Sequence, residues 1–221
     1  MMFDFHTHSF FSDGVLSPIE LIRRAHVAGY RAIAVTDHVG LANMEQLICE
    51  VSKDCLLAEK HWGIEALPGV ELTHIPAAAI AECAKLAKSL GARIVVVHGE
   101  TPVEPVEPGT NRAALMSSDV DILAHPGFIT AEEARMAVIN DIFIEITARG
   151  GHSLTNGHVA KIGLAVGAKL IVNSDAHTPD NIMKAGFAAK VLQGAGIPQE
   201  AHEAVLLNHP LDLLKRIESH R

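Results

Sequence analysis

The stretch "LIVNSDAH" (residues 170–177) is an apolar run that ends in residues able to bind a ligand. Side chains alternate between the two faces of a β-strand, so Asn173, Asp175 and His177 share one face while Val172 points to the other. An apolar run of this length predicts a strand buried on both faces, as in a parallel sheet. The polar face at its end indicates a functional site where the strands of that sheet terminate.

Similar apolar segments alternate with helical patterns along the whole chain, with no change of composition that would mark a linker. Such alternation predicts an α/β fold with a parallel sheet, because a crossover helix must connect each strand to the next. Nearly every segment ends in a polar residue, and only a closed barrel brings all strand ends to one face. We therefore predict a single-domain barrel of seven β/α units over residues 1–221. The expected strands are 3–6, 31–36, 66–71, 94–98, 121–125, 142–147 and 169–173.

Helix signals agree with this alternation. Ser17 followed by Pro18 predicts the start of a helix, and Gly29 predicts its end. Further helices are expected over 76–90 and after Thr130, Thr155 and Thr178. The irregular stretch 99–111, rich in Pro and Glu, is predicted to be a surface loop at the rim of the site. Residues from Pro198 onward are expected to form one or two closing helices.

The composition excludes several classes of protein. The chain has 221 residues, 48% of them hydrophobic and 20% charged, which is typical of a globular protein and not of a disordered one. A net charge of -8 argues against binding to long nucleic acids. No apolar run has membrane-spanning length, so no membrane association is expected. Three cysteines without CxxC spacing indicate reduced thiols and a cytoplasmic location. The oligomeric state stays open.

The direction of the polar strand ends follows from the architecture of a barrel. Helices cover the outside and require apolar partners, so polar faces should point inward and toward the rim. In the first strand His6 and His8 share a face, and we expect Phe3 and Phe5 to take the opposite, outward face. Eight residues are then predicted to meet at one rim: His6, His8, His38, Glu71, His98, His125, Asp175 and His177.

Imidazole and carboxylate groups in this number predict a centre for divalent ions such as Zn, Mn or Fe. They exceed the roughly four to six ligands that one ion takes, so two or three ions sharing a carboxylate are expected. Each motif alone also has an ordinary explanation, such as a surface pair for His6 and His8. Their coincidence at the strand ends favours the metal centre. The other histidines are expected on the surface or in packing: His26, His61, His74, His158, His202, His209 and His220.

The segments "HTHSFFSDG", "VTDH", "PGVELTH", "VVHGE", "LAHPG" and "NSDAH", in this order, resemble the PHP (polymerase and histidinol phosphatase) family. The resemblance covers essentially the whole chain. It implies a distorted (β/α)7 TIM-like barrel with up to three metal ions at the carboxyl ends of the strands. It also implies three sets of ligands: His6, His8, Glu71 and Asp175; Glu71, His98 and His125; and Asp13, His38 and His177.

The resemblance implies phosphoester hydrolysis, in which a hydroxide that bridges two ions attacks phosphorus. No catalytic residue is expected besides the metal-bound hydroxide. Arg149, His152 and Asn156 are candidates for binding the substrate, although Arg149 could instead pair with Glu145. Three residues are expected to orient the ligands from behind: Asp37, Glu100 and Glu145.

The predicted function is a metal-dependent phosphatase acting on a small phosphorylated metabolite, similar to histidinol phosphatases. One alternative is a nucleotide or cyclic phosphodiesterase that uses the same ions. Another is a non-catalytic metal-binding or regulatory module associated with a polymerase. The sequence does not indicate which ester is the physiological substrate.

Overall fold

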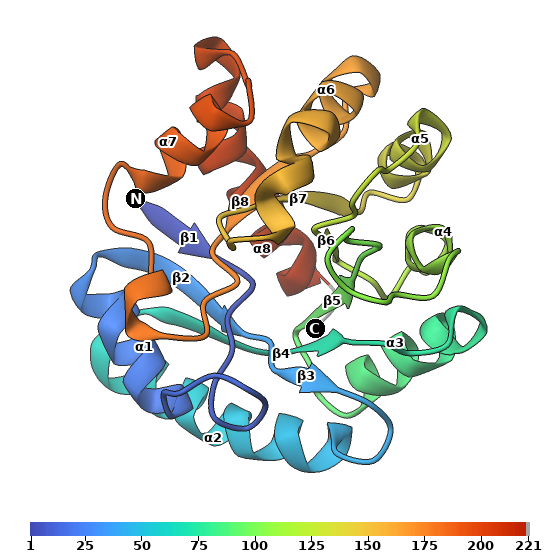
Figure 1. The fold of residues 1–221 in the computed structure, drawn as a ribbon. Coiled ribbons are helices and arrows are strands. Elements are labelled where there is room, and N and C mark those ends of the chain that lie inside the picture. The colour runs from blue at the N-terminus through green and yellow to red at the C-terminus, as the bar shows by residue number, and fades with distance from the viewer. Residues whose placement is uncertain (220–221) are drawn as a thin grey trace.

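A parallel sheet forms the centre of the protein in the computed structural model, which describes residues 1–219 (Figure 1). The strands are β1 (Met2–Asp4), β2 (Tyr30–Val35), β4 (Glu65–Leu72), β5 (Ile94–His98), β6 (Ile122–Ala124), β7 (Phe143–Thr147) and β8 (Leu170–Asn173). Each pairs in parallel with the next, and the short β3 (His38–Val39) pairs with β4 beyond the end of β2. The predicted seven-stranded α/β barrel is therefore confirmed.

Side chains close the barrel between its first and last strands. The only bridge described there between the two backbones joins Thr7 to Ala176. Below it, the Phe5 amide donates to the Asn173 side-chain oxygen at 2.9 Å. The Ser174 amide donates to the Asp4 carboxylate at 3.1 Å. These side chains satisfy backbone groups that a regular ladder would otherwise pair, and the barrel is distorted at this seam.

Helices surround the barrel in chain order (Figure 1). They are α1 (Pro18–Val27), α2 (Met44–Trp62), α3 (Ile80–Ser89), α4 (Thr110–Leu115), α5 (Ala131–Ile139), α6 (Asn156–Val166) and α7 (Phe187–Gly194), whereas α8 (His209–Ser219) lies under one end of the barrel. The Ser17 hydroxyl caps α1 and Thr130 forms a capping box on α5, as their sequences predict. The prediction of a helix starting after Thr178 is wrong, because a 3-10 turn, η3 (Pro179–Asn181), forms there instead. Within residues 1–219, no helix is long and apolar enough to cross a membrane.

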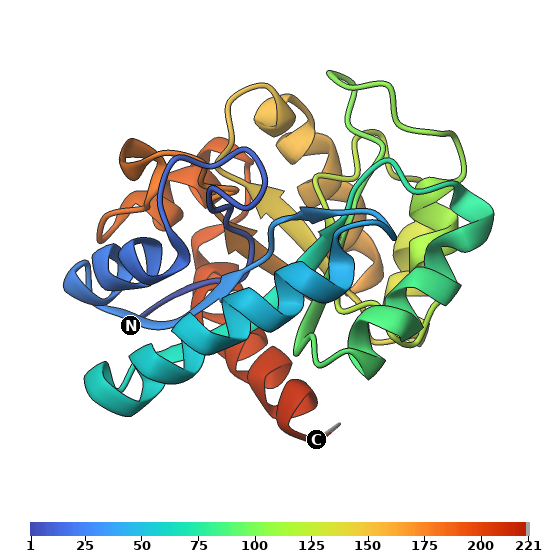
Figure 2. The ribbon, with the colours of Figure 1, turned by 90° about the horizontal axis from the view of Figure 1, so that it is seen from below.

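Helix α8 closes the barrel from the end opposite the functional loops (Figure 2). Its Leu213, Leu214 and Ile217 pack against the inward side chains of the strands. Phe3 and Phe5 belong to this inner cluster, so the prediction that they point outward is wrong. The register of β1 shifts between its first two residues, and the strand ends at its third, so strict alternation does not extend to the histidines. Outward side chains form a second cluster with the surrounding helices.

Candidate metal centre

The nine predicted ligands gather above the inner apolar cluster, at the carboxyl ends of the strands. Their donor atoms fall into groups within which all atoms lie within 4.8 Å of one another. The groups are His6, His8 and Asp175; His6, Glu71 and His125; His98, His125 and His152; and His8, Asp13, His38 and His177. We call the regions around Asp175, His98 and Asp13 the first, second and third positions.

Two of these ligands stand where the backbone turns sharply after a strand. His125 follows β6 with φ of 25°, and Asp175 lies just beyond β8 with φ of 51°. Positive φ is unfavourable for residues other than glycine, and such strain concentrates at functional sites. At both places the turn directs a buried side chain over the mouth of the barrel, which favours a functional role for the conformation.

The first position is built on His6 and His8. His6 Nε2 lies 3.3 Å from a Glu71 oxygen, and His8 Nε2 lies 3.2 Å from an Asp175 oxygen. On the far side of the His6 ring, Nδ1 lies 2.8 Å from Glu145, which also accepts from the Asn173 amide. A carboxylate on Nδ1 holds the proton there and leaves Nε2 free to bind a cation.

Glu71 lies at the centre of the whole group and is fully buried. One carboxylate oxygen lies 3.3 Å from His6 and 3.6 Å from His125. The other lies 2.7 Å from His38 and 3.6 Å from His8. Because its two oxygens face different histidines, this carboxylate is the group best placed to be shared between ions.

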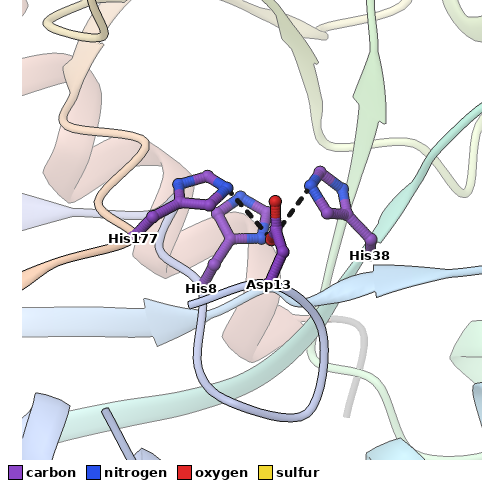
Figure 3. A group of neighbouring side chains, drawn as sticks. All are labelled: His8, Asp13, His38 and His177. Carbon is purple, nitrogen blue, oxygen red and sulfur yellow. Dashed lines mark ion pairs between the residues drawn. The ribbon is translucent and has the colours of Figure 1, made fainter. Parts of the chain in front are cut away.

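Figure 3 shows the third position, where Asp13 lies between His38 and His177. The same Asp13 oxygen is 3.1 Å from His177 Nε2 and 3.4 Å from His38 Nε2. The Asp13 side chain is 55% exposed, so this position opens to solvent. Asp37 lies behind it and fixes its loop, because the Asp37 carboxylate accepts hydrogen bonds from both Ser9 and Ser12.

The second position contains two residues that the sequence did not indicate as ligands. His152, expected to contact the substrate, lies in one group with His98 and His125. Glu104, from the loop after β5, lies 3.1 Å from His98 and was not predicted at all. The sequence feature that could have indicated Glu104 is the repeated Glu-Pro pattern of that loop, but this pattern does not predict where the loop lies in the folded protein.

Several other predicted residues lie elsewhere. Glu100 does not orient a ligand, because its carboxylate accepts from the amides of Gly109 and Asn111 at the start of α4. The Asn156 amide forms hydrogen bonds with the backbone of Thr147, which fixes the start of α6 on β7. His74, expected in packing, lies 3.5 Å from Glu104. His220 lies outside the described residues.

Arg149 is the cation beside the cluster. Its Nε lies 3.9 Å from an Asp175 oxygen, and its side chain is 30% exposed. Glu145, its alternative predicted partner, is engaged with His6 and Asn173. The guanidinium therefore stands at the open edge of the site, where it can form a forked contact with an anion.

The donor set fits bound divalent ions. Within residues 1–219, buried ligand atoms of His6, His8, Glu71 and Asp175 form no hydrogen bond, which is costly unless a cation satisfies them. Ligands about 2.0–2.1 Å from a tetrahedral ion lie roughly 3.3 Å apart. The contacts of 3.1–3.4 Å between imidazole nitrogens and carboxylate oxygens match that spacing.

The charge states also suit metal binding. Burial opposes ionisation of Glu71, but the charges of His6 and His38 outweigh it and hold its pKa well below the usual range. Burial lowers the pKa of the His8 and His125 imidazoles, which keeps them neutral. Ionised carboxylates and neutral imidazoles are the forms that bind metal ions.

Metal binding should release protons. Burial lowers the pKa of His38, but Glu71 and Asp13 outweigh it and raise the value to about 10, and the pKa of His6 is also raised. Both rings are therefore protonated at pH 7 in the metal-free protein and must become neutral to act as ligands. Affinity should fall as the pH falls. Calorimetric titration with Zn²⁺ at pH 7 in two buffers of different ionisation enthalpy measures the protons released. A heat that is the same in both buffers would contradict the prediction.

Comparisons with known proteins agree with the geometry. The family model of the PHP domain matches residues 4–117. An uncharacterized protein of Methanocaldococcus jannaschii is 54% identical over 220 residues, covering 98% of this chain and 100% of that protein. A probable phosphatase of Thermoanaerobacter is 29% identical over 217 residues, covering 90% of this chain and 89% of the relative.

A solved structure shares the fold. Histidinol phosphate phosphatase of Lactococcus lactis, crystallised with zinc, L-histidinol and phosphate, matches with a TM-score of 0.57 and 17% identity. The match covers 89% of this chain and 94% of that one. The family model spans more than half of the sequence, and a relative matches over its full length, so the chain belongs to the PHP domain family.

Proposed function

We propose that this metal-dependent phosphoesterase hydrolyses small phosphomonoesters with two or three divalent ions, of which Zn, Mn and Fe suit the donors. The observation that carries the proposal is the set of three adjoining ligand positions around Glu71. A phosphomonoester has three terminal oxygens, whereas a diester has two. Ligands for three neighbouring cations would supply positive charge for all three terminal oxygens of a monoester, which favours the monoester over the diester.

When bound, the ions supply Lewis acidity and lower the pKa of coordinated water toward neutrality. The chain contributes the positions of the ligands and of the substrate. Glu145 keeps a proton on His6 Nδ1, which presents Nε2 to the first position. Asp37 fixes the loop that carries Asp13. Arg149, at the open edge, can bind a terminal phosphate oxygen and so orient the phosphorus for in-line attack.

The class of the leaving group is inferred from the charge around the site. The loop after β5 places a negatively charged carboxylate, Glu104, over the second position. Together with the net charge of -8, this disfavours long nucleic acids and favours a small phosphorylated metabolite. Histidinol phosphate is the first compound to test, because a protein of the same fold was crystallised with its hydrolysis products.

Hydrolysis of p-nitrophenyl phosphate should exceed hydrolysis of bis-p-nitrophenyl phosphate, measured after chelation and re-addition of Mn²⁺ or Zn²⁺. A faster rate on the bis ester would overturn the proposal in favour of a phosphodiesterase. Absence of hydrolysis of either ester, in protein shown to contain metal, would favour a non-catalytic metal-binding module. A panel of phosphorylated metabolites that includes histidinol phosphate would then identify the preferred leaving group.

A further inference from the structure

The loop after β5 is fixed at both ends by its own glutamates. Near its start, Glu100 accepts from the amides of Gly109 and Asn111. Near its end, Glu107 accepts from the Ala77 amide. A side chain at Gly127 would collide with the Glu100 carbonyl, so glycine there permits the close approach of the two backbones. These contacts fix the loop over the second position.

The side chain of Glu104, which lies between these two glutamates, accepts no hydrogen bond from a backbone amide of the described residues. One carboxylate oxygen lies 3.1 Å from His98 Nε2 and 3.5 Å from His74 Nε2. The other oxygen lies 3.4 Å from His152 Nε2. The Glu104 carboxylate is thus directed at two imidazoles of one position.

The same two imidazoles present their Nε2 atoms to this position. On the opposite side of each ring, His98 Nδ1 lies 3.2 Å from the Gly99 carbonyl, and His152 Nδ1 lies 2.8 Å from the Thr101 hydroxyl. Hydrogen bonding at Nδ1 is the arrangement that orients histidines bound to metals. The His125 and His152 rings stack at 4.2 Å, which brings the third imidazole to the same place.

We infer that Glu104 and His152 are metal ligands at the second position, beside His98 and His125. Each Glu104 oxygen lies 3.1–3.4 Å from one imidazole nitrogen, close to the roughly 3.3 Å expected between neighbouring ligand atoms of one ion. Three imidazoles and a carboxylate suit Zn²⁺ or another borderline ion. The inference rests on the proposed metal centre, but it adds two ligands that no strand carries, Glu104 from the loop after β5 and His152 from the turn before α6.

The inference has a clear rival. Glu104 could form an ion pair with protonated His98 only while the position holds no ion, and move away when metal binds. In that case the carboxylate would compete with the metal, and its removal would strengthen metal binding. If Glu104 is a ligand, its removal weakens binding at one position. The two roles for Glu104 therefore predict opposite changes in the affinity for metal when Glu104 is removed.

The test is a titration of Glu104→Gln, His152→Gln and the wild type with Zn²⁺ alone, after chelation, using calorimetry and a competing chromophoric chelator. Glu107→Gln is the matched control, because Glu107 is a carboxylate of the same loop that contacts only a backbone amide among the described residues, and the glutamine oxygen can still accept that hydrogen bond. We expect Glu104→Gln and His152→Gln to lose at least roughly tenfold in affinity for one ion. Glu107→Gln should bind like the wild type.

Cobalt provides a second readout that does not depend on hydrolysis. The visible absorption of Co²⁺ reports its donors, so Glu104→Gln should change the band of one bound ion and leave the others. Unchanged affinity and spectrum, or tighter binding, in Glu104→Gln would overturn the inference. If the wild type binds metal with these ligands but hydrolyses no ester, the inference holds and the proposed function fails.

Discussion

Glu71→Gln should lower kcat for p-nitrophenyl phosphate hydrolysis by roughly 10³-fold, because it removes the carboxylate that holds the ions. A metal ion acting as Lewis acid lowers the activation free energy by several kcal/mol, and each 1.36 kcal/mol changes the rate about tenfold. Glutamine keeps the shape of the side chain but cannot supply a charge to four histidines at once. Metal content should fall together with the rate. Steady-state kinetics and elemental analysis of purified variants give both quantities.

Asp13→Asn is the matched comparison for this substitution. Among the described residues, the Asp13 carboxylate forms ion pairs with the histidines of the third position alone, and it is half exposed, so water can replace part of its role. We expect a loss of roughly 10- to 100-fold, the range found when a metal site loses a supporting group. Circular dichroism should show that both variants fold. Equal residual rates in the two variants would mean that Glu71 is not shared between ions.

Removal of metal should also destabilise the protein strongly. The buried donors of His6, His8 and Asp175 would lose the cation that satisfies them. A single ion present at 100 times its Kd stabilises a protein by about 2.7 kcal/mol. For a chain of this size that corresponds to a fall in Tm of roughly 5–11 °C when a chelator removes one ion. Differential scanning fluorimetry of metal-loaded protein, with and without a chelator, measures the change.

Glu71→Gln supplies the control for the thermal experiment. If the stabilisation comes from the cluster, the chelator should shift the Tm of this variant much less than that of the wild type. Re-addition of Zn²⁺ or Mn²⁺ should restore the wild-type Tm, whereas Ca²⁺, which prefers sites made entirely of oxygen ligands, should restore less. An unchanged Tm after chelation, in protein shown to have lost its metal, would rule out a structural contribution from the ions.

The barrel was predictable because its strands are short apolar runs with helix signals between them. Strand faces followed from alternation where the strand is regular: Glu145 on β7 and Asn173 on β8 point inward as expected. Alternation failed for β1, which ends before the histidines begin. There the neighbouring residues Phe5 and His6 both point into the barrel, whereas in a regular strand neighbouring side chains point to opposite faces.

The site was predictable to the extent that its residues lie at strand ends. Glu104 lies in a loop without periodicity, and its position depends on tertiary contacts of Gly127 and Ala77. Glu100 follows β5 as a ligand would, but its carboxylate accepts from backbone amides at the start of α4. Asn156 begins α6, and its side chain bonds to the backbone of Thr147 at the end of β7. Composition does not distinguish these positions from ligand positions.

The seam between β1 and β8 has a consequence for how the protein acquires its metal. The hydrogen bonds that close it join residues 168 and 170 positions apart, so closure must wait for almost the entire chain. His6 and His8 lie just after β1, on one side of the seam, and Asp175 lies just after β8, on the other side. The first position therefore cannot exist in a partly synthesised or partly folded molecule. The third position also needs His177, which lies beyond β8, so early intermediates would hold at most the ion of the second position. Capture of the ion at the first position would mark the completion of the barrel.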